Sequence, residues 1–173
     1  SNSNLFTKEL VGAYYMEKTE IGKKIINFTL ESTNKDGFRS KDYLGRNIVL
    51  FFYPKDNTPG CTQEGIDFSN NHRKFKTLDT EIFGVSRDNL KSHNNFKNKY
   101  KYKFDLLSDP DEILCASFDV IKEKNMYGKK YMGIERSTFL IDKKGKLIKE
   151  WRKVKIPDHV NDVLKFIKEL NKN

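Results

Sequence analysis

The sequence predicts an α/β protein whose sheet is covered by helices on both sides. The apolar run NIVLFFYP, at residues 47–54, is typical of a strand that is buried on both faces of a sheet. Strand-like segments alternate along the chain with segments of helical periodicity. The 173 residues contain no linker rich in Pro, Gly or Ser, so we predict one domain over residues 21–173, preceded by an N-terminal extension at 1–20.

Before Leu78, the sequence predicts a hairpin, the buried strand and one long helix. Residues 24–32 and 38–44 flank the turn signal NKDG, which indicates a hairpin that leads into a short helical turn. From Cys61 onward, the residues of one face recur at intervals of three and four, as in an amphipathic helix. This inward stripe comprises Cys61, Gly65, Phe68, His72, Phe75 and Leu78.

Beyond that helix, strands and helices continue to alternate. EIFGVS, at residues 81–86, reads as a second strand, and Asp88 is the predicted N-cap of a helix in DNLKSHNNFKNKY. Next come FDLLSD, a short helix in DEILCASF, and a hairpin of RSTFLID and KLIKEWR around the turn KKGK. The last helix, PDHVNDVLKFIKEL, has an apolar face of Val160, Val163, Leu164 and Ile167.

The chain is basic, with a formal net charge of +9 and a pI of about 9.4. The stretches KNKYKYK (97–103) and YGKKY (127–131) interleave aromatic residues with lysines, a pattern that proteins binding single-stranded nucleic acid use. Solvated helix and loop faces give the same pattern, and we favour that interpretation. A weak, non-specific association with nucleic acid remains the alternative.

Hydropathy and cysteine content restrict the cellular setting. No segment approaches the roughly 18 consecutive apolar residues of a membrane span, and the first residues lack the apolar core of a secretory signal. Two cysteines, 54 positions apart, do not form a disulfide framework, which indicates an intracellular reducing compartment. We expect a monomer that does not bind a membrane. We expect it to be located in the cytoplasm or nucleus, and an organelle is the alternative location.

The segment FFYPKDNTPGC places a cysteine just beyond the buried strand. Ligands of α/β sheets gather at the carboxyl ends of strands. Thr58 is the predicted N-cap of the helix that follows, Pro59 suits its first position, and Gly60 lets the backbone approach a small ligand closely. Cys61 then lies in the first turn, where unpaired backbone N–H groups favour an anion such as a thiolate.

A thiolate at this position would also be stabilised by a fixed positive charge nearby. Arg136 opens an apolar strand that should adjoin the buried one, which makes it the candidate cation. An exposed arginine at the start of a strand is an equally good interpretation of the spacing alone. His72, His93 and His159 show no metal-ligand spacing, so we predict no metal and interpret them as surface or core histidines.

At this point the segment FYPKDNTPGCTQE resembles the signature of peroxiredoxins, Pro-x-x-x-Thr-x-x-Cys, with Pro54, Thr58 and Cys61 at the three positions. The surrounding sequence is similar to that of the bacterioferritin-comigratory, or Q-type, subfamily. The similarity extends over about residues 21–170 and includes DYLG, GVSRDNLKSHNNF, LLSDPDE and YGKKYMGIERSTFLID.

The resemblance implies a thioredoxin-like fold with an N-terminal β-hairpin extension, and thiol-dependent reduction of hydrogen peroxide and organic hydroperoxides without a cofactor. It implies that Cys61 is the peroxidatic thiolate, that Thr58 binds a peroxide oxygen and that Pro54 shields the sulfur. Arg136 would hold thiolate and peroxide, and Glu64 would support it as a weaker assignment. The rival is a thioredoxin-fold binding module that has lost the chemistry and associates with nucleic acid through its lysines.

The sequence departs from the resemblance at the second thiol, which should reduce the sulfenic acid formed on Cys61. Many Q-type members carry a resolving cysteine five residues later, where this chain has Ile66, and others carry it in the next helix, which here lacks cysteine. Only Cys115 remains, and we predict that it is not the resolving cysteine. The reductant would then be an external thiol: thioredoxin, as in thioredoxin-dependent peroxiredoxins, glutaredoxin or glutathione.

Overall fold

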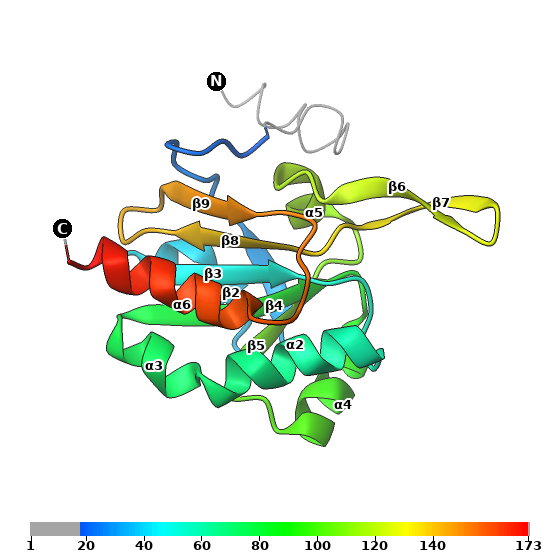
Figure 1. Cartoon of the computed structure of the whole chain (residues 1–173), viewed down its shortest axis with the longest axis horizontal. Helices are drawn as coiled ribbons and strands as arrows, with labels where there is room; N and C mark the ends of the chain where they lie inside the picture. Colours follow the sequence, from blue (N-terminus) through cyan, green and yellow to red (C-terminus); the bar gives the residue numbers. More distant parts are fainter. Residues whose placement is uncertain (1–17, 173) are drawn as a thin grey trace.

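A computed structural model of the chain describes residues 18–172, so most of the predicted extension at 1–20 lies outside the described residues. The main sheet runs in the order β2 (Phe38–Arg39), β1 (Thr29–Ser32), β5 (Asp105–Ser108), β4 (Thr80–Ser86), β3 (Asn47–Phe52), β8 (Ser137–Ile141) and β9 (Leu147–Trp151). One face packs against α2 (Pro59–Asn70), α3 (His72–Thr77), α4 (Leu90–Tyr100) and α6 (His159–Leu170), and the other against α5 (Ile113–Ser117) (Figure 1). The prediction of helices on both sides of a sheet is confirmed.

Strand β3 is buried along its whole length, as its apolar sequence predicts. It pairs in parallel with β4 and antiparallel with β8, with Phe52 opposite Ser137. Because successive side chains of a strand point to opposite faces, β3 contributes to two separate cores. We call the core with Val49, Phe51 and Phe68 the helix-side core, and the core with Leu50 and Phe52 the hairpin-side core.

The predicted N-terminal hairpin is present as β1 and β2, which pair antiparallel and bring Leu30 opposite Phe38. Gly37 closes the turn with a φ of 74°, a left-handed conformation that favours glycine. The short helical turn that was expected next is a 3-10 helix, η2 (Ser40–Tyr43). Phe38 stacks on Phe28, so the hairpin covers the hairpin-side core.

The long helix predicted from Cys61 onward is divided into α2 and α3. Asn71 ends the first helix with φ −104° and ψ 7°, and its side-chain amide donates to the carbonyl of Asp67 at 2.8 Å. The prediction of one continuous helix was therefore wrong. The sequence pattern hides the break because the apolar stripe resumes in phase after it. Phe68 and Phe75, one on each helix, are both buried in the helix-side core.

The N-cap of α4 is Asn89, whose side chain accepts from the backbone N–H of Ser92 at 2.8 Å. The prediction of Asp88 as this N-cap was wrong, because its carboxylate has other partners. It accepts from the Ser86 hydroxyl and, at 3.0 Å, from the backbone N–H of Asp56. Asp88 therefore connects the end of β4 with the loop after β3.

The second sheet is a hairpin of β6 (Ile121–Met126) and β7 (Lys129–Ile134) that projects from the body of the molecule (Figure 1). It was not predicted, and the basic stretch at 127–131 includes its turn and the start of β7. The predicted hairpin around KKGK is confirmed as β8 and β9. Helix α6 buries its predicted face of Val160, Val163, Leu164 and Ile167.

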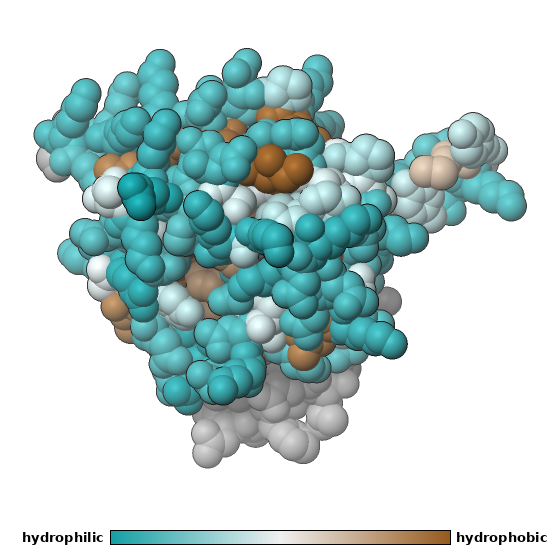
Figure 2. Space-filling view, turned by 90° about the horizontal axis from the view of Figure 1, so that it is seen from below, coloured by the Kyte–Doolittle hydropathy of each residue, from teal (hydrophilic) through white to brown (hydrophobic). Residues whose placement is uncertain are grey.

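The two basic stretches have different settings. In the stretch 97–103, Tyr102 is 4% exposed in the helix-side core, and Lys97 is 2.7 Å from Asp105. In the stretch 127–131, by contrast, Tyr127 is fully exposed at the tip of the hairpin. Hydrophilic side chains cover most of the face in Figure 2. No helix in the described part of the chain is long and apolar enough to cross a membrane.

Candidate active site

Cys61 lies where the carboxyl end of β3 meets the start of α2. The helix begins at Pro59, so Cys61 is its third residue, as predicted. The carbonyl of Thr58 accepts the first helical hydrogen bond, from the N–H of Thr62 at 2.9 Å. The backbone N–H of Cys61 precedes that bond and belongs to the unpaired donors of a first turn. The Cys61 side chain faces the helix-side core and is only 1% exposed.

Thr58 occupies the N-cap position, but its side chain does not act as the cap. Its backbone is extended, with φ −94° and ψ 153°, and among the described residues its hydroxyl accepts no helix N–H. Instead, the hydroxyl donates to the carbonyl of Lys55 at 2.8 Å. The proton of the hydroxyl is therefore engaged, and its lone pairs can accept a hydrogen bond from a ligand.

Arg136 reaches the Cys61 sulfur from the neighbouring strand. It immediately precedes Ser137 of β8, which is paired with Phe52 at the end of β3. Its Nη2 is 3.3 Å from Cys61 Sγ, and its Nη1 donates to Glu64 Oε1 at 2.6 Å. Burial opposes the charge of Arg136, but Glu64 and Cys61 outweigh this effect and raise the pKa of the guanidinium. The structure therefore places a permanent cation against the sulfur.

Glu64, one turn after Cys61, is fully buried. Its Oε1 accepts from Arg136, whereas Oε2 has no hydrogen-bond partner among the described residues. Burial raises the pKa of Glu64 to about 7, although Arg136 acts in the opposite direction. The Glu64 carboxylate holds the guanidinium of Arg136 in place. Burial disfavours the charged form of Glu64, so the free energy that this burial costs depends on pH.

We expect Glu64→Gln to remove a pH-dependent component of stability. An acid whose pKa is raised in the folded state binds more protons there than in the unfolded chain, so stability falls as pH rises from about 4.5 to about 7. Urea unfolding of both proteins across this range measures the effect. Relative to the wild type, the variant should gain stability with rising pH, by up to about 3 kcal/mol. A difference that does not change with pH would contradict this assignment.

Gly60 lies close to two side chains of the site. A Cβ atom placed there would be 3.1 Å from Ile156 Cδ1 and 3.4 Å from Arg136 Nη2. The first of these contacts would be tight, although the end of the Ile156 side chain could relieve it by a small shift, and the second is an ordinary van der Waals distance. Ile156, which precedes α6, is a half-buried apolar neighbour of the site that sequence reasoning did not identify.

A second group that sequence reasoning missed surrounds Asp56, in the loop of residues 54–58. Ligand atoms of Asp56, Asp88 and His93 all lie within 4.8 Å of one another, which corrects the expectation that the histidines join no such cluster. These atoms bond to one another or to neighbouring groups: His93 Nδ1 is 2.7 Å from Asp56 Oδ2, and its Nε2 is 2.9 Å from the carbonyl of Leu107. The cluster is therefore a hydrogen-bonded network. No local sequence spacing indicates it, because His93 lies 37 positions from Asp56.

The remaining predicted residues lie at different places. Pro54 is half-buried at the beginning of the 54–58 loop. Cys115 is buried in the hairpin-side core, whereas Cys61 belongs to the helix-side core, so the sheet separates the two cysteines. Burial, with Asp109 nearby, raises the pKa of the Cys115 thiol far above its usual range.

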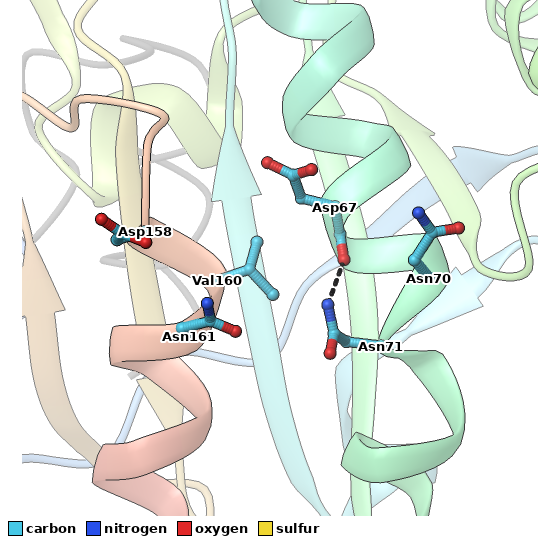
Figure 3. A pocket seen from close by; sticks show the side chains of 6 residues that line it. All are labelled: Asp67, Asn70, Asn71, Asp158, Val160 and Asn161. Atoms are coloured by element: carbon cyan, nitrogen blue, oxygen red, sulfur yellow. Dashed lines mark hydrogen bonds between the residues drawn. The ribbon is translucent and has the colours of Figure 1, made fainter.

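A polar depression of about 250 Å³ lies apart from this chemistry, between the end of α2 and the start of α6 (Figure 3). Asp67 and Asp158 face it from opposite sides, and its remaining lining is Asn70, Asn71, Val160 and Asn161. None of these residues contacts Cys61 or Arg136 through a hydrogen bond in the described structure.

Comparison with known proteins gives consistent results. The AhpC/TSA family matches residues 21–150. Peroxiredoxin Bcp of Bacillus subtilis is 51% identical over 152 residues, which cover 88% of this chain and 97% of that protein. A mutant of Xylella fastidiosa PrxQ is 42% identical, with a TM-score of 0.85 over 90% of this chain and 99% of that one. A structure of Xanthomonas campestris bacterioferritin comigratory protein, described with its alkyl peroxide reduction activity, is 47% identical, with a TM-score of 0.76 over 82% and 90%.

Proposed function

Because the chain belongs to the AhpC/TSA family of peroxiredoxins, with their thioredoxin-like fold and thiol-dependent peroxidase activity, we propose that Cys61 is its peroxidatic residue. The observation that carries this assignment is the guanidinium of Arg136 at 3.3 Å from the Cys61 sulfur, in the first turn of α2. A fixed cation and unpaired helix amides both favour a thiolate there. Cys115 is also the third residue of its helix, but its backbone N–H donates to Asp109 Oδ2 at 2.7 Å, and this carboxyl group disfavours a thiolate.

The geometry suggests how the peroxide is held. The Cys61 thiolate attacks one peroxide oxygen, so that an S–O bond forms while the O–O bond breaks, and the other oxygen leaves as hydroxide or alkoxide and takes up a proton. Cys61 is oxidised to a sulfenic acid and the peroxide is reduced. Arg136 and the Cys61 N–H would donate to the peroxide oxygens as charge moves between them. The Thr58 hydroxyl, whose proton is given to Lys55, would accept from the O–H of the hydroperoxide.

Organic hydroperoxides are the second substrate class that we propose. Alkyl peroxide reduction is described for the related Xanthomonas campestris protein. In this chain, the half-buried Ile156 beside Gly60 offers an apolar contact for an alkyl group, and Pro54 would shield the sulfur from water. Glu64 would keep Arg136 oriented toward the sulfur.

The sulfenic acid must be reduced by a thiol, and we propose that this thiol comes from outside the chain. A disulfide needs Cα atoms within about 7 Å of each other. Cys61 and Cys115 belong to cores on opposite faces of the sheet, so a bond between them would require the sheet or both helices to open. Burial also keeps Cys115 protonated, and a protonated thiol is a poor nucleophile.

Accordingly, Cys115→Ser should retain turnover close to that of the wild type. The measurement is steady-state peroxide consumption with thioredoxin, glutaredoxin and glutathione in turn, which also identifies the preferred reductant. Intact mass after one equivalent of peroxide should show one added oxygen rather than the loss of two hydrogens. Stalling of the variant after a single turnover, or a Cys61–Cys115 disulfide formed at a catalytically competent rate, would overturn the external route.

The basic surface supports no more than a secondary role. Tyr102 of one basic stretch is buried in the core and cannot stack on a base. Exposed lysines attract nucleic acid weakly, without regard to sequence, and this attraction weakens steeply with salt. We therefore propose a peroxidase whose catalysis does not depend on nucleic acid.

A further inference from the structure

We propose that His93 is a positioning residue for the peroxide reaction, because it fixes the 54–58 loop, and with it Thr58 and Cys61, against α4. This inference rests on the proposed role of Cys61. It concerns the network around Asp56, in which no residue touches the sulfur. Three elements meet there: the loop after β3, the first turns of α4, and strand β5.

His93 bridges two of these elements with both of its ring nitrogens. Its side chain is fully buried on α4. Nε2 lies 2.9 Å from the carbonyl of Leu107 in β5, and since a carbonyl can only accept, Nε2 carries a proton. Nδ1 lies 2.7 Å from Asp56 Oδ2, so a further proton is shared between the ring and the carboxyl group. The ring therefore joins the loop to the sheet through two hydrogen bonds, one to Asp56 and one to Leu107.

Asp56 is the point at which the loop is held. It is 5% exposed, and its carboxyl group also accepts from the hydroxyls of Tyr53 at 2.6 Å and Ser92 at 2.8 Å. Burial, with Asp56 beside it, raises the pKa of Tyr53 well above its usual range, so the phenol stays protonated and donates. The backbone N–H of Asp56 donates in turn to Asp88. Both the side chain and the backbone are thus fixed two residues before Thr58.

The segment after α4 holds the other side of the same structure. The hydroxyl of Tyr102 donates to the carbonyl of Thr62 at 2.9 Å, one residue beyond Cys61. A Cβ atom at Gly65 would be 2.4 Å from Tyr102 Cζ, so the ring fits only because this residue is glycine. Cys61 therefore lies between two attachments, one at Asp56 and one at Thr62. Loss of the first would free the loop while leaving α2 in place.

This arrangement predicts opposite effects on the two halves of the catalytic cycle. Attack on peroxide needs Thr58, Cys61 and Arg136 in register, and a displacement of about 1 Å in such a site can cost as much as 100-fold in rate. Access of an external thiol to Cys61, which is only 1% exposed, instead requires the loop to open. Loosening the loop should slow the first step and speed the second.

Two substitutions of His93 separate positioning from simple stability. The side-chain amide nitrogen of Asn can take the place of Nδ1, so His93→Asn can still donate to Asp56. The amide nitrogen of Gln reaches the place of Nε2, so His93→Gln can bond to Leu107 but not to Asp56. Each variant loses one of the two hydrogen bonds, and we expect similar losses in urea unfolding. A second buried histidine, His159, bonds to Thr138 at 2.7 Å and provides His159→Asn as a matched control.

Stopped-flow oxidation by hydrogen peroxide and the rate of alkylation by a bulky maleimide, both at pH 7, are the readouts. We expect His93→Gln to react with peroxide about tenfold more slowly and with the maleimide faster. His93→Asn should stay within about threefold of the wild type in both rates, as should His159→Asn. Equal loss of peroxide reactivity in His93→Asn and His93→Gln, or no loss in either, would overturn the proposal.

Should His93→Gln fail to fold, Tyr53→Phe tests the same point, because it removes one donor to Asp56 and keeps the ring that fills the core. It should shift both rates in the same directions by smaller factors, and unchanged rates would refute the positioning role. The wild type and Cys61→Ser are measured alongside. If Cys61→Ser still consumed peroxide, the assignment of Cys61 would have failed, independently of any result for His93.

Discussion

Cys61→Ser is expected to abolish peroxidase activity with every reductant while leaving the fold intact. Serine is close to cysteine in size, but its hydroxyl does not ionise near neutral pH and so provides no anionic nucleophile. The side chain is 1% exposed, so burying a hydroxyl there should lower the free energy of unfolding by about 1–3 kcal/mol. Peroxide consumption, circular dichroism and urea unfolding measure these effects.

Cys115→Ser is the matched control, because it places the same hydroxyl in the core on the other face of the sheet. It should lose a similar amount of stability and retain activity. Residual turnover in Cys61→Ser that requires Cys115 would show that the second cysteine reacts with peroxide. Such a result would contradict both its burial and the raised pKa of its thiol.

Those parts of the fold that depend on local patterns could be predicted from the sequence. The uninterrupted apolar run of β3 and the apolar face of α6 each carry their own signal, because the periodicity lies within one element. The hairpin of β6 and β7 was missed for the same reason. No residue of its β6 strand is buried and most of β7 is exposed, so few buried positions impose an alternating pattern.

Two errors at helix ends have tertiary causes. Asp88 and Asn89 are adjacent residues that both suit an N-cap, and contacts of Asp88 with the loop and β4 decide between them. The break at Asn71 is hidden because Phe75 continues the stripe of α2 in phase. Neither outcome can be derived from spacing alone.

In the candidate site, too, some residues could be predicted from the sequence and others depend on tertiary contacts. Arg136 could be inferred because the strand that it opens was expected beside β3, and the structure pairs those strands. His93 could not be inferred, since its contact with Asp56 depends on how α4 packs against the loop. Ile156 likewise approaches Gly60 only through the path of the chain before α6.

The second large effect is expected for Arg136→Met, which should slow the reaction with peroxide by about 100- to 1,000-fold, the range for removing one donor from an oxyanion site. The residual activity of the variant should appear only at a higher pH than in the wild type. The reason is that the variant lacks the cation that lies 3.3 Å from the Cys61 sulfur and favours its thiolate form. Pre-steady-state oxidation measured from pH 5 to 9 checks both statements. An unchanged pH profile would remove Arg136 from the site.

The variant also leaves Glu64 buried without its cation, so at a pH above 7, where this carboxyl group ionises, an unpaired buried charge costs about 3–5 kcal/mol of stability. The double variant Arg136→Met/Glu64→Gln separates this effect from catalysis. Neutralising Glu64 should restore much of the lost stability, whereas the slow reaction with peroxide should persist because no cation faces the sulfur. Arg136→Lys should be intermediate, since an ammonium group keeps the charge but cannot donate to Cys61 and Glu64 with the planar fork of a guanidinium. Recovery of the peroxide rate in the double variant would mean that Arg136 acts on stability alone.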